Sequence, residues 1–346
     1  MSRKAIAAAA LAAACAVGSP KEWGHAPPVP RGLDLHLPVP ADNPLTPEKV
    51  ALGRRLFFEP LLSRDSTLSC ASCHQPALGF GDGRARSPGA DGGLTQRSAP
   101  AIVNRAYGTH QFWDGRADAL EEQVLATLIQ PRELGGDTTQ VLRSLRRNAA
   151  YRRAFRGAFG RDADAAALAA ALASYVRTIL SGDAPFDRYA EGDTTALTPI
   201  QRAGLRLFRG KARCATCHLG SRLTDDGFHN TGVAWRGGAL RDSGRFTVTR
   251  SVRDLGAFKT PTLREISRTA PYMHDGSLAT LEEVVEFYDR GGIDNPHLDP
   301  ELRQLHLRDT EKRALIAFLG ALSGAVREGW YAAPPALART PGHRTR

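Results

Sequence analysis

Apolar residues recur at helical spacing along much of the chain, and this pattern predicts a mainly α protein. An Ala-rich helix is expected over Ala163 to Leu180. Ser181 to Leu197, which follows it, is interpreted as a linker between two domains. A later helix, around Thr310 to Leu322, carries four apolar residues on one side. They are Leu315, Phe318, Leu319 and Leu322.

A longer pattern occurs twice. Thr46-Pro47 is followed by Gly53-Arg54-Arg55-Leu56-Phe57, and Thr198-Pro199 is followed by Gly204-Leu205-Arg206-Leu207-Phe208. Threonine is a good N-cap and proline suits the first position of a helix, so each copy predicts a short amphipathic helix. The repeat indicates two related domains.

Each copy of the repeat leads into a pair of cysteines. The two motifs read Cys70-Ala71-Ser72-Cys73-His74 and Cys214-Ala215-Thr216-Cys217-His218. In a C-x-x-C-H pattern the thiols add to the vinyl groups of haem, and the histidine lies beneath the porphyrin as the proximal iron ligand. The sequence therefore predicts two covalently bound haem c groups, one in each domain.

Paired cysteines also occur in structural zinc sites and in thioredoxin-like redox sites. Two zinc knuckles usually lie about 15 to 20 residues apart, whereas Cys73 and Cys217 are much further apart. A thioredoxin motif needs no histidine directly after it and would not occur twice. Both alternatives are therefore disfavoured.

The length of 346 residues suits two domains of about 150 residues each. We expect an export signal at 1–20, a proline-rich leader at 21–45, an N-terminal haem domain at 46–190, a C-terminal haem domain at 195–330 and a disordered basic tail at 331–346. The predicted fold is thus mainly α, with two cytochrome c-like haem domains joined by a short linker.

The first residues favour export to the periplasm. Met1-Ser2-Arg3-Lys4 precedes an Ala-rich apolar run from Ala5 to Val17, which is the layout of a bacterial signal and is too short to span a bilayer. Leu11 to Cys15 loosely matches a lipoprotein cleavage box. A lipid anchor at Cys15 is therefore the one membrane attachment that the sequence leaves open.

The net charge is +10 at pH 7, which would attract an acidic partner. Nucleic acid is the other class of partner that a basic protein suggests. It is discounted, because the Lys and Arg residues are scattered and no nucleic-acid-binding motif accompanies them.

Together with the second haem motif, four blocks resemble the bacterial di-haem cytochrome c peroxidase and MauG family, from about Leu45 to Trp330. The blocks are Ser69-Cys70-Ala71-Ser72-Cys73-His74, Gln111-Phe112-Trp113-Asp114-Gly115-Arg116, Lys259-Thr260-Pro261-Thr262-Leu263-Arg264 and Ala270-Pro271-Tyr272-Met273-His274-Asp275-Gly276. The resemblance implies that the N-terminal haem, with His74, reacts with peroxide. The C-terminal haem, with His218, would be a low-spin relay that accepts electrons from a small donor protein, a cytochrome c or a cupredoxin.

The resemblance also implies three catalytic residues. The tryptophan of the F-W-D-G block lies between the haems in this family and is Trp113 here. Peroxide cleavage needs a proton-transferring group close to the iron; the family uses a glutamate assisted by a glutamine, at positions that match Glu133 and Gln123. Without the family, Trp113 would be a core aromatic and Glu133 a solvated surface residue. Leu134 stands where methionine is common.

Many members of the family block the peroxidatic iron with a second histidine from the loop after the first haem motif. Ala90 stands at the matching place, and no histidine lies between His74 and His110. We therefore expect a five-coordinate or water-ligated first haem that needs no prior reduction.

The second haem has two candidate sixth ligands. Met273 is the only methionine after the initiator, but the family spacing from the H-D-G histidine leads to Tyr288. A helix that begins at Thr280 would carry Leu281, Val284 and Tyr288 on one face, which favours Tyr288. A tyrosinate stabilises oxidised iron, whereas a methionine thioether raises the potential.

Calcium commonly lies between the domains in this family. Thr269 and Pro271 match its usual ligands, whereas Ser98 replaces a usual asparagine. His229 and His274 are further candidate ligands, but a histidine is more often a hydrogen-bonding residue. His274 belongs to the H-D-G block and is expected to support the region between the domains.

The leading hypothesis is reduction of hydrogen peroxide to water at the first haem, with electrons entering through the second and crossing by way of Trp113. The alternative enzyme is a MauG-type oxidase that modifies a protein substrate through a high-valent iron intermediate, which Tyr288 favours. The third is a non-catalytic electron-transfer cytochrome c, against which Glu133 and an open first haem argue.

Overall fold

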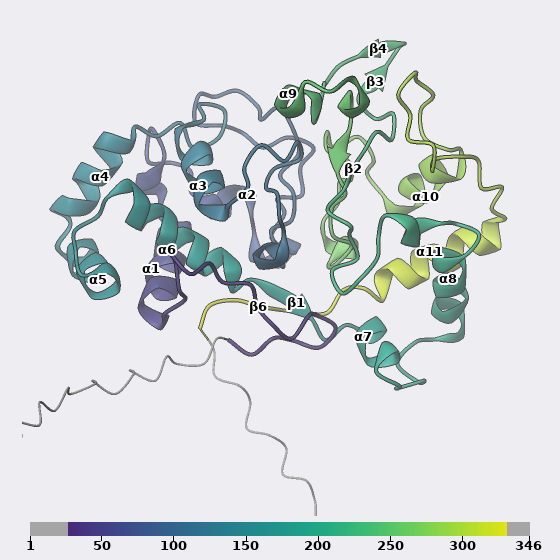
Figure 1. The fold of residues 1–346 in the computed structure, drawn as a ribbon, viewed down its shortest axis with the longest axis horizontal. Helices are drawn as coiled ribbons and strands as arrows, with labels where there is room; N and C mark the ends of the chain where they lie inside the picture. The colour runs from purple at the N-terminus through teal and green to yellow at the C-terminus, as the bar shows by residue number, and fades with distance from the viewer. Residues whose placement is uncertain (1–26, 331–346) are drawn as a thin grey trace, which may run out of the picture.

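The computed structural model of the protein describes residues 27–330 (Figure 1). The predicted export signal, Cys15 and the basic tail lie outside these residues. Helices predominate in the described part, as the apolar periodicity predicts. None of these helices is long and apolar enough to cross a membrane.

The strands are too short to build a core, so the helices do. The helices are α1 (Pro47–Phe57), α2 (Cys70–Cys73), α3 (Leu120–Ile129), α4 (Thr138–Arg147), α5 (Ala149–Phe159), α6 (Ala165–Arg177), α7 (Pro185–Ala190), α8 (Pro199–Arg209), α9 (Phe246–Thr249), α10 (Leu281–Asp289) and α11 (Asp309–Gly320). The strands pair in antiparallel twos: β1 (Leu180–Gly182) with β6 (Ala325–Arg327), β2 (Phe228–His229) with β5 (Phe258–Lys259), and β3 (Trp235–Arg236) with β4 (Ala239–Leu240).

The two copies of the Thr-Pro pattern form the helices α1 and α8, as predicted. The Thr46 hydroxyl accepts a hydrogen bond from the backbone N–H of Lys49 and caps α1. The Thr198 hydroxyl does the same for α8 by accepting from the N–H of Gln201. In both helices proline occupies the first turn, where its missing N–H costs no hydrogen bond.

The repeated glycine explains how each of these helices packs. A Cβ on Gly53 of α1 would lie 1.9 Å from the carbonyl oxygen of Ala171 in α6, and a Cβ on Gly204 of α8 would lie 2.0 Å from that of Ala314 in α11. Only glycine allows backbones to approach so closely. The repeat therefore encodes the same helix crossing twice.

Buried apolar side chains form two large clusters. The helices that carry them lie in the two halves of Figure 1. One cluster is built from residues 50–179, including α1 and α3 to α6, with Leu56, Phe155 and Tyr175 fully buried. The other is built from residues 197–322, including α8, α10 and α11, with Phe318 and Leu322 fully buried. The apolar face expected near the C-terminal end of the chain is thus a core face.

The stretch expected to be a linker also contains regular structure. The helix α6 ends at Arg177, before the Leu180 that the sequence suggests, and β1 follows it directly. The helix α7 then places Phe186 and Tyr189 against the second cluster. Because β1 pairs with β6, the chain crosses between the two clusters twice.

The described part of the leader has no helix or strand, yet it is packed against the rest of the protein. Leu33 and Leu37 are buried with Tyr107 and Leu180 in a small third cluster. The buried Arg264 guanidinium donates to the carbonyl of Gly32 at 2.8 Å. This segment therefore runs along the junction of the two clusters.

Candidate functional site

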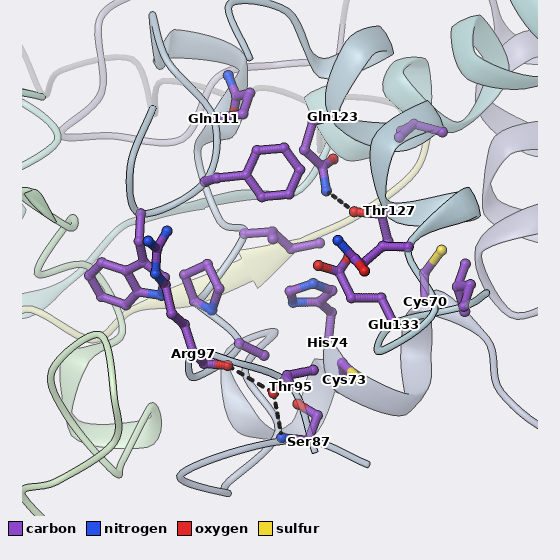
Figure 2. A pocket seen from close by; sticks show the side chains of 18 of the residues that line it. Cys70, Cys73, His74, Ser87, Thr95, Arg97, Gln111, Gln123, Thr127 and Glu133 are labelled. Carbon is purple, nitrogen blue, oxygen red and sulfur yellow. Dashed lines mark hydrogen bonds between the residues drawn. The ribbon is translucent and has the colours of Figure 1, made fainter. Parts of the chain in front are cut away.

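The first cysteine motif opens into a cavity of about 450 Å³ (Figure 2). Cys70, Cys73 and His74 line it, and neither thiol forms a disulfide. The His74 Nδ1 lies 3.1 Å from the carbonyl oxygen of Phe80, which orients the ring and leaves Nε2 available to a metal. Burial lowers the pKa of His74, so the imidazole stays neutral, the form that binds metals.

The second motif has the same local arrangement. His218 Nδ1 lies 3.0 Å from the carbonyl oxygen of Leu223, and burial lowers the pKa of this histidine as well. Burial raises the pKa of the Cys70 and Cys214 thiols to about 12. These half-buried, unpaired thiols are therefore protonated at neutral pH.

The residues present fit haem c. Each site offers two free thiols and a neutral histidine held by a backbone carbonyl, which are the groups that attach the porphyrin and bind its iron. An apolar porphyrin also needs an apolar wall. The cavity provides one with Leu68, Ile102, Val124, Leu128, Leu172 and Val176.

Polar side chains gather on one side of the same cavity. The Gln123 amide donates to the Thr127 hydroxyl at 3.0 Å, and both residues lie on α3. Figure 2 shows Gln123, Thr127 and Glu133 pointing into the space next to the His74 ring. Burial raises the pKa of Glu133, although Thr127 and the charge of Arg116 partly oppose this. The carboxyl group therefore holds a proton more readily than an exposed glutamate does.

The loop that carries Ala90 supports this arrangement. The Ala90 N–H donates to the carbonyl oxygen of Glu133 at 2.9 Å and so ties the loop to the segment that carries the carboxylate. Among residues 27–330, His74 is the only histidine that lines the cavity. No described side chain is therefore placed to act as a second histidine ligand there.

Trp113 lies where the two clusters meet. Its indole Nε1 donates to the carbonyl of Ser98 at 2.8 Å, and its own carbonyl accepts from the N–H of Lys259 in β5 at 2.8 Å. Ser98 in turn donates its N–H to the carbonyl of His274 at 2.8 Å. Trp113 is thus fixed to segments from both halves of the chain while it lines the cavity.

Tyr288 lies beside the second motif. Its side chain is half-buried on α10, and desolvation together with the neighbouring Cys214 and Cys217 raises the pKa of the phenol. Met273 lies in a turn, in which the backbone N–H of Gly276 donates to the Met273 carbonyl at 3.2 Å. Tyr288 therefore stays the predicted ligand of the second haem, with Met273 as the alternative.

Comparison with known proteins agrees with this geometry. Residues 47–195 match the model of the di-haem cytochrome c peroxidase family. The chain is 43% identical over 288 residues to the methylamine utilization protein MauG of Methylorubrum extorquens, covering 83% of this chain and 81% of that protein. It is 39% identical over 351 residues to the cytochrome-c peroxidase IdrP1 of Denitromonas iodatirespirans, covering 92% and 91%.

The chain belongs to the di-haem cytochrome c peroxidase family. A solved structure of a MauG-like protein associated with microbial copper homeostasis has the same fold, with a TM-score of 0.76 and 35% identity over 86% of this chain and 93% of that one. Membership confirms the family resemblance seen in the sequence. It makes the protein an oxidoreductase of the cytochrome-c peroxidase class, and it implies two haem groups.

Two histidines outside the motifs have hydrogen-bonding or packing roles, as expected. His229 lies between Asp299, 2.6 Å from its Nδ1, and Asp225, 3.0 Å from its Nε2. The His274 ring stacks on Phe258 with centroids 3.6 Å apart and an interplanar angle of 9°. His274 thus supports the junction of the clusters.

The calcium site common in the di-haem peroxidase family stays a prediction. Ser98 is buried, the Thr269 hydroxyl donates to the carbonyl of Ile266 at 3.4 Å, and Pro271 follows a cis peptide bond. Each is held by the protein itself, and no contact in the described part of the chain joins the three into one cluster.

Sequence reasoning gave no role to several residues of the cavity, among them Thr127, Arg105 and Lys259. A signal for Thr127 existed, because it follows Gln123 by four positions on one helix and so shares its face. Lys259 opens the K-T-P-T-L-R block, which the family resemblance marked without a role. Arg105 carried no signal, because its importance arises from packing against distant segments.

Proposed function

We propose that the protein is a two-domain c-type peroxidase of the periplasm, which reduces hydrogen peroxide to water with electrons from a small donor protein. Residues 46–190 would form the peroxidatic domain and residues 195–330 the electron-transferring domain. The observation that carries this proposal is the first cavity: it combines a single histidine with the polar group Gln123, Thr127 and Glu133.

Cys70, Cys73 and His74 would hold the first haem, and Cys214, Cys217 and His218 the second, in agreement with the fit of both motifs. Bound there, the haems would supply the redox-active iron on which a peroxidase depends. This assignment also leaves the Glu133 side of the first cavity free for peroxide.

Glu133 is proposed to move the proton. Reduction of hydrogen peroxide to two waters consumes two electrons and two protons, and the oxygen that leaves must gain a proton. The Glu133 carboxylate can take a proton from one oxygen of the peroxide and return it to the other oxygen, which leaves as water. Gln123 would orient the peroxide, with its amide held by Thr127 at 3.0 Å.

Electrons would enter through the second haem and cross by way of Trp113. This role is supported by the contacts of Trp113 with both halves of the chain. The net charge of +10 suits an acidic donor, because opposite charges speed the encounter. A lipid anchor at Cys15 and calcium at Ser98, Thr269 and Pro271 remain the two additions that the sequence suggests.

The second candidate is a MauG-type oxidase that modifies a protein substrate, and the placement of Tyr288 favours it. A tyrosinate ligand would stabilise the oxidised second haem and make it a poor electron donor. The 43% identity to a protein named MauG points the same way.

One experiment separates these readings. The fully oxidised protein with both haems attached is mixed with hydrogen peroxide and a reduced small cytochrome c, without prior reduction of the enzyme. The peroxidase proposal expects immediate oxidation of two cytochromes for each peroxide. Little donor oxidation together with a long-lived change in the haem spectrum would support the MauG-type reading, and no reaction at all would contradict both.

A further inference from the structure

The cavity wall formed at the junction of the two clusters contains two buried cations that the peroxide chemistry does not use. Arg105 lies in the short helical turn Arg105–Tyr107, and Lys259 lies in β5. Their side chains are only 11% and 9% exposed. Burying a charge is costly unless an opposite charge or hydrogen bonds compensate it, so each cation should have a counter-charge.

The described residues supply too little negative charge. Arg105, Lys259 and Arg222 share one carboxylate, Asp226, to which Arg222 is hydrogen-bonded. Arg105 Nη1 and Lys259 Nζ lie 3.7 Å and 3.9 Å from Asp226 Oδ1, beyond hydrogen-bond distance. The next carboxylate, Asp225, is engaged by His229 at 3.0 Å. Arg105 also donates to Gln111 Oε1 at 3.0 Å and to the carbonyl of His110 at 2.6 Å, but these partners are uncharged. Three cations therefore face one available anion.

A second buried lysine, Lys49, has hydrogen bonds that compensate the burial of its charge. Lys49 Nζ donates to Asn43 Oδ1 at 3.1 Å and to the carbonyl of Pro44 at 3.0 Å. Lys259 Nζ has no hydrogen bond to any residue among 27–330. Burial and the neighbouring Arg105 lower the pKa of Lys259 to about 7, so an added anion would favour the charged form of this lysine.

The position of these cations identifies the anion. Haem has two vinyl groups on one edge and two propionate carboxylates on the opposite edge, and the cysteines fix the vinyl edge. Figure 2 shows Cys70 and Arg97 on opposite sides of the His74 ring. Lys259 lies on the same side as Arg97. The backbone N–H of Lys259 donates to the carbonyl of Trp113, and the Trp113 indole donates to the carbonyl of Ser98, which follows Arg97 in the chain.

We infer that Lys259 and Arg105 bind the propionate carboxylates of the haem held by Cys70, Cys73 and His74. Lys259 comes from the C-terminal half of the chain and the haem motif from the N-terminal half, so this contact would join the two halves through the cofactor. A charged lysine or arginine makes strong hydrogen bonds to a carboxylate. The inference rests on the proposed function only in requiring haem attachment at the first motif.

The test uses the protein with both haems attached, and counting two haems per chain checks the attachment separately. The variants are Lys259→Met, which removes the charge, and Lys259→Arg, which keeps it. Lys49→Met is the matched control, because it removes a buried lysine that does not line the cavity. The readout is the propionate bending band in the resonance Raman spectrum of the high-spin haem, a band that reports hydrogen bonding to the propionates.

Lys259→Met should move this band to lower frequency, while Lys259→Arg restores it and Lys49→Met leaves it unchanged. An unchanged band in Lys259→Met with two haems attached would overturn the inference and leave the peroxidase proposal intact. A free anion is the other source of negative charge. If the wild-type band or its Lys259 dependence changed between chloride, acetate and phosphate buffers, a free anion would occupy the site and the inference would be wrong.

If Lys259→Met fails to fold, Arg105→Gln and a crystal structure of the wild-type protein with both haems keep the question decidable. The structure should show a propionate oxygen within hydrogen-bond distance of Lys259 Nζ. A propionate turned away from both cations would overturn the inference.

Discussion

The two cysteine motifs share their local structure and differ in what faces the histidine. In both, a helix that begins with Thr-Pro precedes the motif, a glycine on that helix allows a close crossing, and the histidine Nδ1 binds a backbone carbonyl. Around His74 lies an open cavity with Gln123, Thr127 and Glu133. Next to the second motif lies the half-buried phenol of Tyr288.

This difference suits the two tasks that we propose for the two haem sites. A haem iron with an open side can bind peroxide, whereas an iron with a protein ligand on each side is suited to electron transfer. The residues that differ come from segments distant from the motifs, namely α3 and its following loop for the first site and α10 for the second. The two sites therefore differ in the residues that surround the C-x-x-C-H motifs, and the motifs themselves are alike.

The largest effect is expected from Glu133→Gln, which removes the proton acceptor at the open site. General acid–base catalysis typically contributes about 10²- to 10⁴-fold, so kcat for peroxide reduction should fall by at least about 10²-fold. Both haems should remain attached with unchanged spectra. Steady-state turnover with a reduced cytochrome c measures the effect, and unchanged turnover would remove Glu133 from the mechanism.

Tyr288→Phe should change the second site and leave the first as it is. Loss of a tyrosinate ligand should alter the spectrum of the low-spin haem and raise its potential. Met273→Leu is the matched control and should change neither. A spectroelectrochemical titration decides this, and the opposite pattern, with the methionine variant altered, would make Met273 the ligand.

Gly204→Ala tests whether the helix crossing is equally tight in the second cluster. The added Cβ would lie 2.0 Å from a backbone carbonyl, so the free energy of unfolding should fall by about 1 to 3 kcal/mol, as for other overpacked cores. Gly53→Ala should cost a similar amount. Gly157→Ala on α5, where a Cβ meets nothing within 4 Å, is the control. A drop in the denaturation midpoint no larger than in this control would argue against a tight crossing.

Thr127→Val should have the smallest effect. Burial raises the pKa of Glu133 and Thr127 opposes this, so loss of the hydroxyl should raise the pKa further. The ionised carboxylate accepts the proton, and activity is therefore lost as the pH falls through this pKa. The acid limb of the pH profile should move to higher pH by less than about one unit, because a hydrogen bond contributes about 1 kcal/mol. A shift to lower pH would contradict this account.

The sequence predicts local features better than distant contacts. The helices α1, α8 and α11 and their apolar faces follow from caps and periodicity, which act within a few residues. The strands β1 and β6 were not predicted, because three-residue strands carry almost no pattern and pair across most of the chain. Ser181 to Leu197 was therefore interpreted as a simple linker.

The candidate site follows the same rule. The C-x-x-C-H motifs are specific enough to identify haem attachment from sequence alone. The family resemblance suggested Glu133, Gln123 and Tyr288. In the structure Glu133 and Gln123 line the cavity at the first motif, and Tyr288 lies near the cysteines of the second. Lys259 and Arg105 escaped notice because a shortage of negative charge becomes visible only when residues from both halves of the chain are brought together.

The central claim is that one haem is open and the other is closed by a protein ligand. The electron paramagnetic resonance spectrum of the fully oxidised protein as isolated tests it most directly. The account predicts one high-spin ferric signal, from the haem at His74, and one low-spin signal of equal intensity, from the haem at His218. Two low-spin signals, one of them with the features of bis-histidine ligation, would contradict it.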